Sequence, residues 1–264
     1  MLDESLREGV IAIAGDAGVA IMAVHDGDDL AVRAKADASP VTAADLAAHR
    51  CIVDGLARLT PEIPVLSEES AHTVPLEQRR SWRRFWLVDP LDGTREFLKR
   101  NGEFTVNIAL IEDGVPVFGV IQSPVSGAVW HGVPGQGAFR RDGDGERRIA
   151  TRSPATAPLR VAASRSHLDP RTAALLQRIG EHDAIGLGSS LKFCLLAEGG
   201  MDAYPRMGPT SEWDTAAGQA ILEAAGGCVL DLRGRPFRYN QRDTLLNGDF
   251  IALGDPGLPW REWL

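Results

Sequence analysis

Trp86-Leu-Val-Asp89-Pro90-Leu-Asp92-Gly93-Thr94 is an apolar run that ends abruptly in two acids, a proline and a glycine. Aromatic and aliphatic residues dominate positions 84–88, which predicts a buried strand ending at Val88. Pro90 and Gly93 then supply the rigid and the permissive backbone positions of a tight turn, and Thr94 can begin a helix. The stretch therefore predicts two carboxylates where a buried strand ends, a place suited to a cation beside a phosphate.

The bulk composition narrows the function classes. With 264 residues, the chain can form one large domain or two packed halves, and its net charge of −8 argues against a broad nucleic-acid-binding surface. A small anionic substrate is compatible with this negative net charge if local cations or metals bind it. The three cysteines are odd in number, widely separated and without CxxC spacing, so neither a disulfide framework nor a zinc site is supported. A reduced, cytoplasmic protein is the simplest interpretation.

The N-terminal segment predicts a helix, because apolar residues recur every three or four positions from Leu2 to Val24. Acidic residues precede its apolar positions, unlike the order in a signal peptide. We find no apolar stretch near the roughly 20 residues that span a bilayer, so no transmembrane segment is expected. A second helix is predicted from Thr42, its cap, to about Leu59.

Four further acids join the first two. Pro64-Val-Leu-Ser67-Glu68-Glu69 is a short apolar run that also ends in acids, as expected if neighbouring strand ends share a cation. Asp45 and Asp214 each lie near a predicted helix start, where capping alone is a sufficient explanation from local sequence. Positions 105–111 and 115–122 are β-rich runs joined by a turn sequence, which predicts a hairpin and a continuing antiparallel meander.

Beyond a Pro/Ala/Thr connection at 154–158, strand and helix patterns alternate, which favours an α/β layer with ligands at the strand carboxyl ends. Ser166 and His167 follow one apolar run, and Ser189, Ser190 and Lys192 follow the next. These are natural anion contacts. Each taken singly could equally be a helix cap with a surface cation.

Together these pieces resemble the inositol monophosphatase superfamily of metal-dependent phosphatases, and within it the bacterial CysQ-type 3'(2'),5'-bisphosphate nucleotidases. The motifs that carry the resemblance are Ser67-Glu-Glu-Ser70, Asp89-Pro-Leu-Asp-Gly-Thr94 and Trp213-Asp-Thr-Ala-Ala-Gly218, and the likeness spans nearly the whole chain. It implies an α/β fold of layered αβαβα type. Residues 1–157 would form an N-terminal α+β half with an antiparallel sheet that binds metal, and residues 158–264 a C-terminal α/β half that binds substrate.

The resemblance also implies the roles of the site residues. Two or three magnesium ions would be bound by Glu68, Asp89, the carbonyl of Leu91, Asp92 and Asp214. Independently, oxygen ligands favour Mg²⁺ over zinc. Asp45 and Thr94 would activate the attacking water, with Glu69 as a supporting acid. The implied substrate contacts are Gly93, Thr94, Ser166, His167, Ser189, Ser190, Lys192, Arg206 and Asp214.

The function implied is removal of the 3'-phosphate from 3'-phosphoadenosine 5'-phosphate by metal-activated water, with 3'-phosphoadenosine 5'-phosphosulfate as a related substrate. The resemblance further implies lithium sensitivity, a part in sulfur assimilation, a monomer or homodimer, and a cytoplasmic protein that could associate peripherally with the inner membrane. The protein would bind the small-molecule nucleotide as its substrate and would not bind a nucleic-acid polymer.

Three alternatives remain in view. An inositol or sugar monophosphatase of the same fold is disfavoured by His167, Ser189, Ser190, Lys192 and Arg206, which resemble nucleotide-site residues. A haloacid-dehalogenase phosphatase is disfavoured because Pro90 stands where its nucleophilic aspartate belongs. A non-catalytic nucleotide-binding regulator could have lost one of its metal-binding acids, whereas all are present here.

Overall fold

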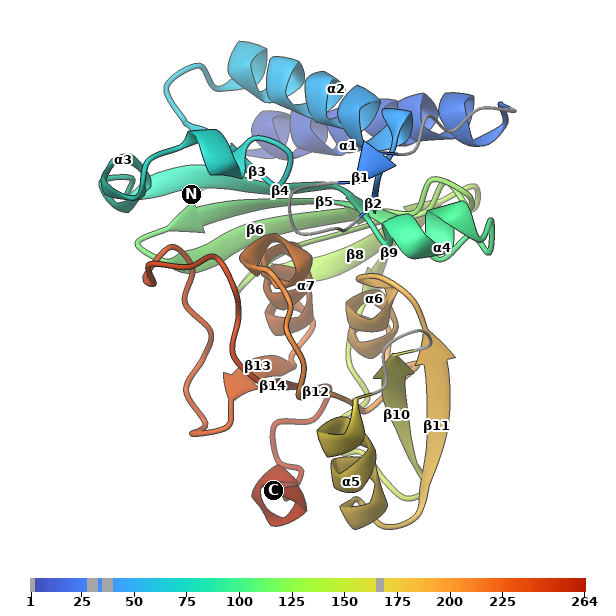
Figure 1. Ribbon diagram of the computed structural model, residues 1–264. Helices are drawn as coiled ribbons and strands as arrows, with labels where there is room; N and C mark the ends of the chain where they lie inside the picture. Colours follow the sequence, from blue (N-terminus) through green and yellow to red (C-terminus); the bar gives the residue numbers. More distant parts are fainter. Residues whose placement is uncertain (1–2, 28–32, 35–39, 165–168) are drawn as a thin grey trace.

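The computed structural model describes residues 3–27, 33–34, 40–164 and 169–264, and its elements stack in five layers (Figure 1). Two long helices cover the outer face of a seven-stranded sheet, two more helices lie between this sheet and a five-stranded sheet, and a last helix and turn cover the far side. The expected αβαβα order is thus confirmed. From the top, the helices are α1 (Glu4–His25) and α2 (Ala43–Leu59), then α6 (Leu191–Ala197) and α7 (Glu212–Ala224), then α5 (Pro170–Arg178) with η2 (Trp260–Trp263).

The first sheet has the strand order β3-β4-β5-β6-β7-β8-β9. Only β3 and β4 run parallel, and the remaining neighbours form the antiparallel meander predicted from the sequence. Its strands are β3 (Val65–Ser67), β4 (Arg84–Asp92), β5 (Thr105–Glu112), β6 (Val115–Gln122), β7 (Val129–Val133), β8 (Gly137–Asp142) and β9 (Gly145–Ile149). Short elements join or flank them: β1 (Arg33–Ala34), β2 (Pro40–Val41), η1 (Ala71–Thr73), α3 (Leu76–Arg80) and α4 (Thr94–Leu98).

The second sheet has the order β11-β10-β12-β14-β13. Strand β10 runs parallel to both β11 and β12, while β14 is antiparallel to both β12 and β13. Its strands are β10 (Leu159–Ser164), β11 (His182–Leu187), β12 (Ala203–Arg206), β13 (Cys228–Asp231) and β14 (Phe250–Leu253). The three parallel strands point their carboxyl ends the same way, which is where ligands gather in such layers.

Three hydrophobic clusters hold the layers together. The first packs α1 and α2 on the seven-stranded sheet, the second fills the space between the two sheets around α6 and α7, and the third lies beneath α5 and η2. Although α7 belongs to the second part of the chain, it packs directly on β5, β6 and β7. Gly119 on β6 allows this close approach, because an added Cβ would lie 2.4 Å from the Ala217 carbonyl oxygen of α7.

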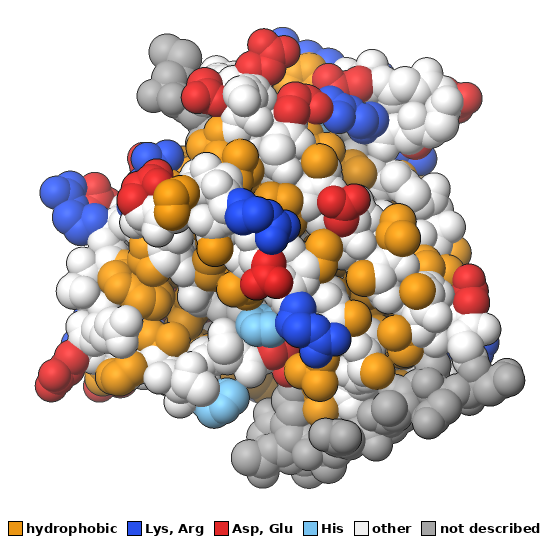
Figure 2. All heavy atoms as spheres, turned by 90° about the horizontal axis from the view of Figure 1, so that it is seen from above, with side chains coloured by type: hydrophobic (Ala, Val, Ile, Leu, Met, Phe, Trp, Pro, Cys, Tyr) orange, Lys and Arg blue, Asp and Glu red, His pale blue; other side chains and the backbone are white. Residues whose placement is uncertain are grey.

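Helix α1 corrects one expectation from the sequence. By length and composition it is long and apolar enough to cross a membrane, although no such stretch was predicted. Its buried side, from Val10 to Ile21, packs against α2, β5 and β6. Its other side is exposed, with Asp16 near the middle of the helix, and hydrophobic side chains on this face are interspersed with charged ones (Figure 2). One side of α1 thus covers the sheet, while the other side is exposed.

Candidate active site

Three carboxylates converge where β4 ends beside the start of α7. Asp89, Asp92 and Asp214 each offer an oxygen atom within 4.8 Å of the others. In the described part of the chain, no other group of three or more such side chains has this spacing. Two of the acids come from the first sheet and one from a helix more than a hundred residues later, so the site is made by the packing of α7 on that sheet.

A bulge in β4 turns both of its acids to the same side. Asp89 pairs with Asn107, and Asp92 pairs with Thr105. Between these two pairs β4 advances by three residues while β5 advances by two. In a regular strand, side chains three positions apart point to opposite faces, and one extra residue restores a shared face. The strand therefore continues to Asp92. The prediction from the sequence, that it ends at Val88 and is followed by a tight turn, is wrong. Gly93 follows in the left-handed conformation, with φ of 91°, and Thr94 begins α4.

Asp92 is fixed from the side of the second sheet. Ser190 Oγ lies 2.7 Å from Asp92 Oδ2 and 2.9 Å from the Asp214 carbonyl oxygen. Asn107 Nδ2 in turn donates to Ser190 Oγ at 2.9 Å, and Thr105 Oγ1 donates to Asn107 Oδ1 at 3.0 Å. Ser190, expected as a substrate contact, lines the cleft described below and also links two of the clustered acids from a buried position.

Asp214 lies in the first turn of α7, as its sequence context indicated. The Ser211 N–H donates to Asp214 Oδ2 at 2.8 Å, and the Ser211 side chain accepts from the Asp214 backbone, which completes a capping box. The capping role and the place in the acid group are therefore compatible. One carboxylate oxygen is fixed by the cap, and the side chain still lines the cleft described below.

Asp45 is held in the same manner at the start of α2. Asp45 Oδ2 accepts from the Thr42 N–H at 2.7 Å and from Thr42 Oγ1 at 2.6 Å. Its other oxygen, Oδ1, accepts a hydrogen bond from Thr94 Oγ1 at 3.3 Å. The Thr94 hydroxyl also lies 3.4 Å from the Leu91 carbonyl oxygen. The structure thus brings Asp45, Thr94 and Leu91 together beside the acid group, although Asp45 and Thr94 are 49 residues apart.

The remaining predicted acids lie in the turn that follows β3. Because β3 pairs in parallel with β4, the chain after Ser67 emerges beside the end of β4, and the Glu68 N–H donates to the Val88 carbonyl at 3.0 Å. Glu68 lines the same cleft as Asp92 and Asp214. Glu69 follows Glu68 in this turn and is partly buried.

The electrostatics of the group favour a bound cation. Burial raises the pKa of Asp89 well above its ordinary value, and the charges of Glu68, Asp92, Asp214 and Asp45 add to that shift. Burial and the charge of Asp92 likewise raise the pKa of Asp214. Like charges gathered in a buried place disfavour ionisation unless a counter-charge is present. All the donors are oxygen atoms, which fits a hard divalent cation such as Mg²⁺.

The raised pKa values predict how the metal-free protein responds to pH. A carboxyl group whose folded-state pKa exceeds its unfolded value binds more protons when folded, so stability falls as pH rises through the folded pKa. We expect metal-free protein to lose stability as pH rises above the ordinary pKa range of a carboxyl group, and Asp214→Asn to lose less over the same interval. Chemical denaturation of both proteins in chelator at several pH values measures this difference. Parallel pH dependences of the two proteins would contradict it.

A cleft of about 640 Å³ opens beside the acids, and both sheets contribute to its lining. Gly93, Thr94 and Glu96 line it from α4 and its start, Ser189 follows β11, and Arg206 ends β12. The carboxyl ends of the parallel strands therefore meet the cleft, as the α/β pattern predicted. Its volume lies within the range usual for small-molecule sites, roughly 300–1,000 Å³.

Lys192 also lines the cleft, but its ammonium group is anchored. Lys192 Nζ donates to the Ser189 carbonyl at 2.6 Å and to the Leu187 carbonyl at 3.1 Å, and it lies 5.2 Å from the centre of the Tyr204 ring. Burial lowers the pKa of Lys192 to about 8. These bonds fix the loop that carries Ser189, whose φ of 47° is left-handed. Lys192 thus shapes the cleft as well as adding positive charge to it.

Two predicted substrate contacts, Ser166 and His167, lie outside the described residues. Other residues were not singled out from the sequence. Asn107 is one of them, and from β5 its buried side chain donates a hydrogen bond to Ser190. The signal that could have identified it is a polar residue within an otherwise apolar strand. Glu103 is another, since its Oε2 accepts from the Gly188 N–H at 2.8 Å and so joins the two halves of the cleft.

Comparison with known proteins agrees with this geometry. The inositol monophosphatase family matches residues 2–253 of the chain. The 3'(2'),5'-bisphosphate nucleotidase CysQ of Escherichia coli strain K12 is 51% identical over 251 residues, which is 95% of this chain and 98% of that protein. The CysQ protein of Salmonella typhimurium is 52% identical over 246 residues, covering 93% of this chain and 98% of that one.

Solved structures give the same result. The crystal structure of CysQ from Bacteroides thetaiotaomicron, described as a bacterial member of the inositol monophosphatase family, superposes with a TM-score of 0.84 at 41% identity, covering 95% of this chain and 97% of that one. The extragenic suppressor protein SuhB from Bartonella henselae gives a TM-score of 0.78 at 27% identity, covering 94% and 93% of the two chains.

Proposed function

This chain belongs to the inositol monophosphatase family, and we propose that it is a magnesium-dependent 3'(2'),5'-bisphosphate nucleotidase that converts 3'-phosphoadenosine 5'-phosphate to AMP and phosphate. The observation that carries the proposal is the acid group of Asp89, Asp92 and Asp214 beside a cleft that is lined by the cations Lys192 and Arg206. The acid group suits a metal-bound phosphate that is cleaved. The part of the cleft that is lined by Lys192 and Arg206 suits a second anionic group, which the product retains.

The metal ligands would be Glu68, Asp89, the Leu91 carbonyl, Asp92 and Asp214, holding two to three ions. When bound, such ions supply Lewis-acid stabilisation of the phosphoryl group and leaving oxygen, and they make water more acidic. The protein's own contribution is to hold its acids in place before the substrate arrives. Asp92 is fixed by Ser190, and Asp214 by the Ser211 N–H.

The pair of Thr94 and Asp45 would take the proton from the attacking water. Thr94 Oγ1 donates its hydrogen to Asp45 Oδ1, so its lone pairs are directed to accept a hydrogen bond from water. As the water attacks phosphorus, its proton would pass to Thr94 Oγ1 while the Thr94 proton passes to Asp45. Asp45 Oδ2 stays engaged with Thr42, which keeps the acceptor oriented. Glu69, in the turn beside Glu68, would act as a supporting acid.

Substrate choice would depend on the part of the cleft away from the acids. Gly93, Ser189, Lys192 and Arg206 line it, and Lys192 and Arg206 place positive charge there. Inositol monophosphate carries a single phosphate and has no second anionic group for these cations. A nucleotide with phosphates on both the 3' and 5' positions has one, as does 3'-phosphoadenosine 5'-phosphosulfate. Ser166 and His167 would complete this part of the site.

The wider setting follows from the same proposal. The enzyme would act in the cytoplasm as a monomer or homodimer, and would clear a nucleotide by-product of sulfur assimilation. Residues 1–157 would serve as the metal-binding half and residues 158–264 as the substrate-binding half. The comparisons do not support peripheral association with the inner membrane.

A comparison of two substrates tests the proposal. With Mg²⁺ present, we expect kcat/KM for 3'-phosphoadenosine 5'-phosphate to exceed that for inositol 1-phosphate by at least about 100-fold, since the second anionic group of the nucleotide meets the positive charge of Lys192 and Arg206. Phosphate release measures both rates, and chromatography identifies the nucleotide product. Equal rates, or adenosine 3'-phosphate as the product, would overturn the substrate assignment.

A further inference from the structure

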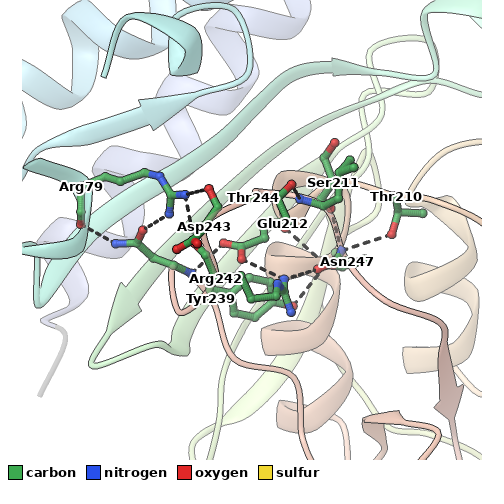
Figure 3. Close-up of polar contacts among 12 residues, drawn as sticks. Arg79, Thr210, Ser211, Glu212, Tyr239, Arg242, Asp243, Thr244 and Asn247 are labelled. Atoms are coloured by element: carbon green, nitrogen blue, oxygen red, sulfur yellow. Dashed lines mark hydrogen bonds and ion pairs between the residues drawn. The ribbon is translucent and has the colours of Figure 1, made fainter. Parts of the chain in front are cut away.

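The loop between β13 and β14 crosses the N-terminal end of α7, and we call residues 239–247 of it the strap (Figure 3). Its backbone pairs with the residues that lead into α7. The Glu212 N–H donates to the Leu245 carbonyl at 2.8 Å, and the Asn247 N–H donates to the Thr210 carbonyl at 2.8 Å. The strap therefore fixes the backbone on both sides of Ser211, the residue that caps α7.

Glu212 is the centre of the side-chain contacts. Its side chain is wholly buried, yet it lies in the first turn of α7, two residues before Asp214. Glu212 Oε2 accepts from the Asn240 N–H at 2.7 Å, and Oε1 accepts from Arg242 Nη2 at 2.8 Å. Both carboxylate oxygens are thus engaged by the strap, and the buried charge is paired (Figure 3).

The strap is in turn anchored to the first part of the chain. Arg79 of α3 is buried, and its guanidinium donates to Asn240 Oδ1 at 2.6 Å and to the Arg242 carbonyl at 3.0 Å. The Tyr239 N–H donates to the Gly114 carbonyl, in the turn between β5 and β6, at 3.0 Å. Contacts of Glu212 therefore connect the start of α7 to the sheet that carries Asp89 and Asp92.

Asn247 connects Arg242 of the strap to Ser211, the residue that caps α7. Asn247 Oδ1 accepts from Arg242 Nη2 at 2.9 Å, while Nδ2 donates to the Ser211 carbonyl at 2.7 Å and to Thr215 Oγ1 at 3.0 Å. Ser211 then holds Asp214 Oδ2 through its N–H at 2.8 Å. A continuous set of hydrogen bonds runs from Arg79 through Glu212 and Asn247 to the Asp214 carboxylate.

We propose that Glu212, held by Asn240 and Arg242 of the strap, is a positioning residue that sets the metal affinity of Asp214. This inference rests on the proposed metal-dependent function. Glu212 touches neither the acid group nor the substrate in this account, and it acts by fixing the turn that aims Asp214. Groups that orient a metal ligand typically change metal affinity or activity by 10–100-fold when they are removed.

The test compares Mg²⁺ binding by wild type and Glu212→Gln, measured by calorimetric titration of the substrate-free protein. Gln keeps the shape but places an N–H₂ group against one of the two donors, so one bond is replaced by a repulsive contact. We expect the Mg²⁺ dissociation constant to rise about 10-fold or more. At saturating Mg²⁺, kcat and KM for the nucleotide should return to near their wild-type values, because the catalytic groups themselves are unchanged.

Asp243→Ala is the matched control. It removes an exposed ion pair between the strap and Arg80 but retains the Asp243 carbonyl that Arg79 contacts, so Mg²⁺ affinity should stay at the wild-type value. Asn247→Ala, which removes the bonds to Ser211 and Thr215, should weaken Mg²⁺ binding as Glu212→Gln does and serves as the test if the Gln variant does not fold.

Wild-type Mg²⁺ affinity in Glu212→Gln, or in Asn247→Ala where that variant replaces it, would overturn the inference and leave the proposed function intact. Absence of Mg²⁺ binding by the wild-type protein would overturn the proposed function and, with it, this inference. An equal loss of affinity in Asp243→Ala would also overturn it, since the effect would then reflect general loosening of the strap.

Discussion

Asp214→Asn is expected to fold normally and to lose nearly all phosphatase activity, with kcat/KM lower by roughly 10³-fold or more, even in saturating Mg²⁺. The Asn oxygen can still accept from the Ser211 N–H, so the cap of α7 is retained. The amide removes one negative charge from the acid group. Loss of a metal ligand removes several kcal/mol of transition-state stabilisation, and each 1.36 kcal/mol corresponds to a factor of ten in rate.

Thermal unfolding in chelator distinguishes loss of chemistry from loss of fold. Because the charges of Asp92, Glu68 and Asp214 repel in the metal-free site, Asp214→Asn should unfold at the same temperature as wild type or at a higher one. Added Mg²⁺ should stabilise the wild-type protein strongly and the variant weakly, because a ligand stabilises the folded state more the further its concentration exceeds its dissociation constant. Near-wild-type turnover by the variant would refute the metal role of Asp214.

Thr94→Val is expected to lower kcat by about 10²- to 10⁴-fold, the contribution usual for proton transfer by a positioned group, while Mg²⁺ affinity stays unchanged. Val replaces Thr with nearly the same shape but lacks the hydroxyl that donates to Asp45 and that would connect the attacking water to it. Steady-state rates at saturating substrate and Mg²⁺, together with calorimetric Mg²⁺ titration, measure the two quantities separately.

Thr94→Ser provides the control for this second prediction, since it restores a hydroxyl at the same position. It should retain a rate between those of wild type and Thr94→Val. If Thr94→Ser is as slow as Thr94→Val, restoring the hydroxyl does not restore the rate, and the proton-transfer role fails. If Thr94→Val instead binds Mg²⁺ weakly, the residue acts through the metal site.

Regular elements with strong local signals could be predicted from the sequence. Thr42 marked the start of α2, and the turn at 112–114 marked the hairpin of β5 and β6, because capping and turn chemistry depend on neighbouring residues. The end of β4 was predicted wrongly. Pro90 suggested a break after Val88, but the bulge absorbs an extra residue and the strand continues to Asp92.

The arrangement of the site depends on contacts that no local pattern contains. Asp45 and Asp214 were each explained adequately as helix-start acids, and both indeed serve in capping boxes. Their convergence on Asp89 follows from how α2 and α7 pack on opposite faces of one sheet. Glu212 was not singled out from the sequence, since its partners Asn240 and Arg242 lie 28 and 30 residues further along the chain.

The most direct test of the central claim is the rate of phosphate release from 3'-phosphoadenosine 5'-phosphate by the wild-type protein, with free Mg²⁺ varied from none, in chelator, to saturation. We expect no turnover in chelator, full recovery on addition of Mg²⁺, and AMP as the nucleotide product. Undiminished turnover in chelator, or no turnover of this nucleotide at any Mg²⁺ concentration, would contradict it.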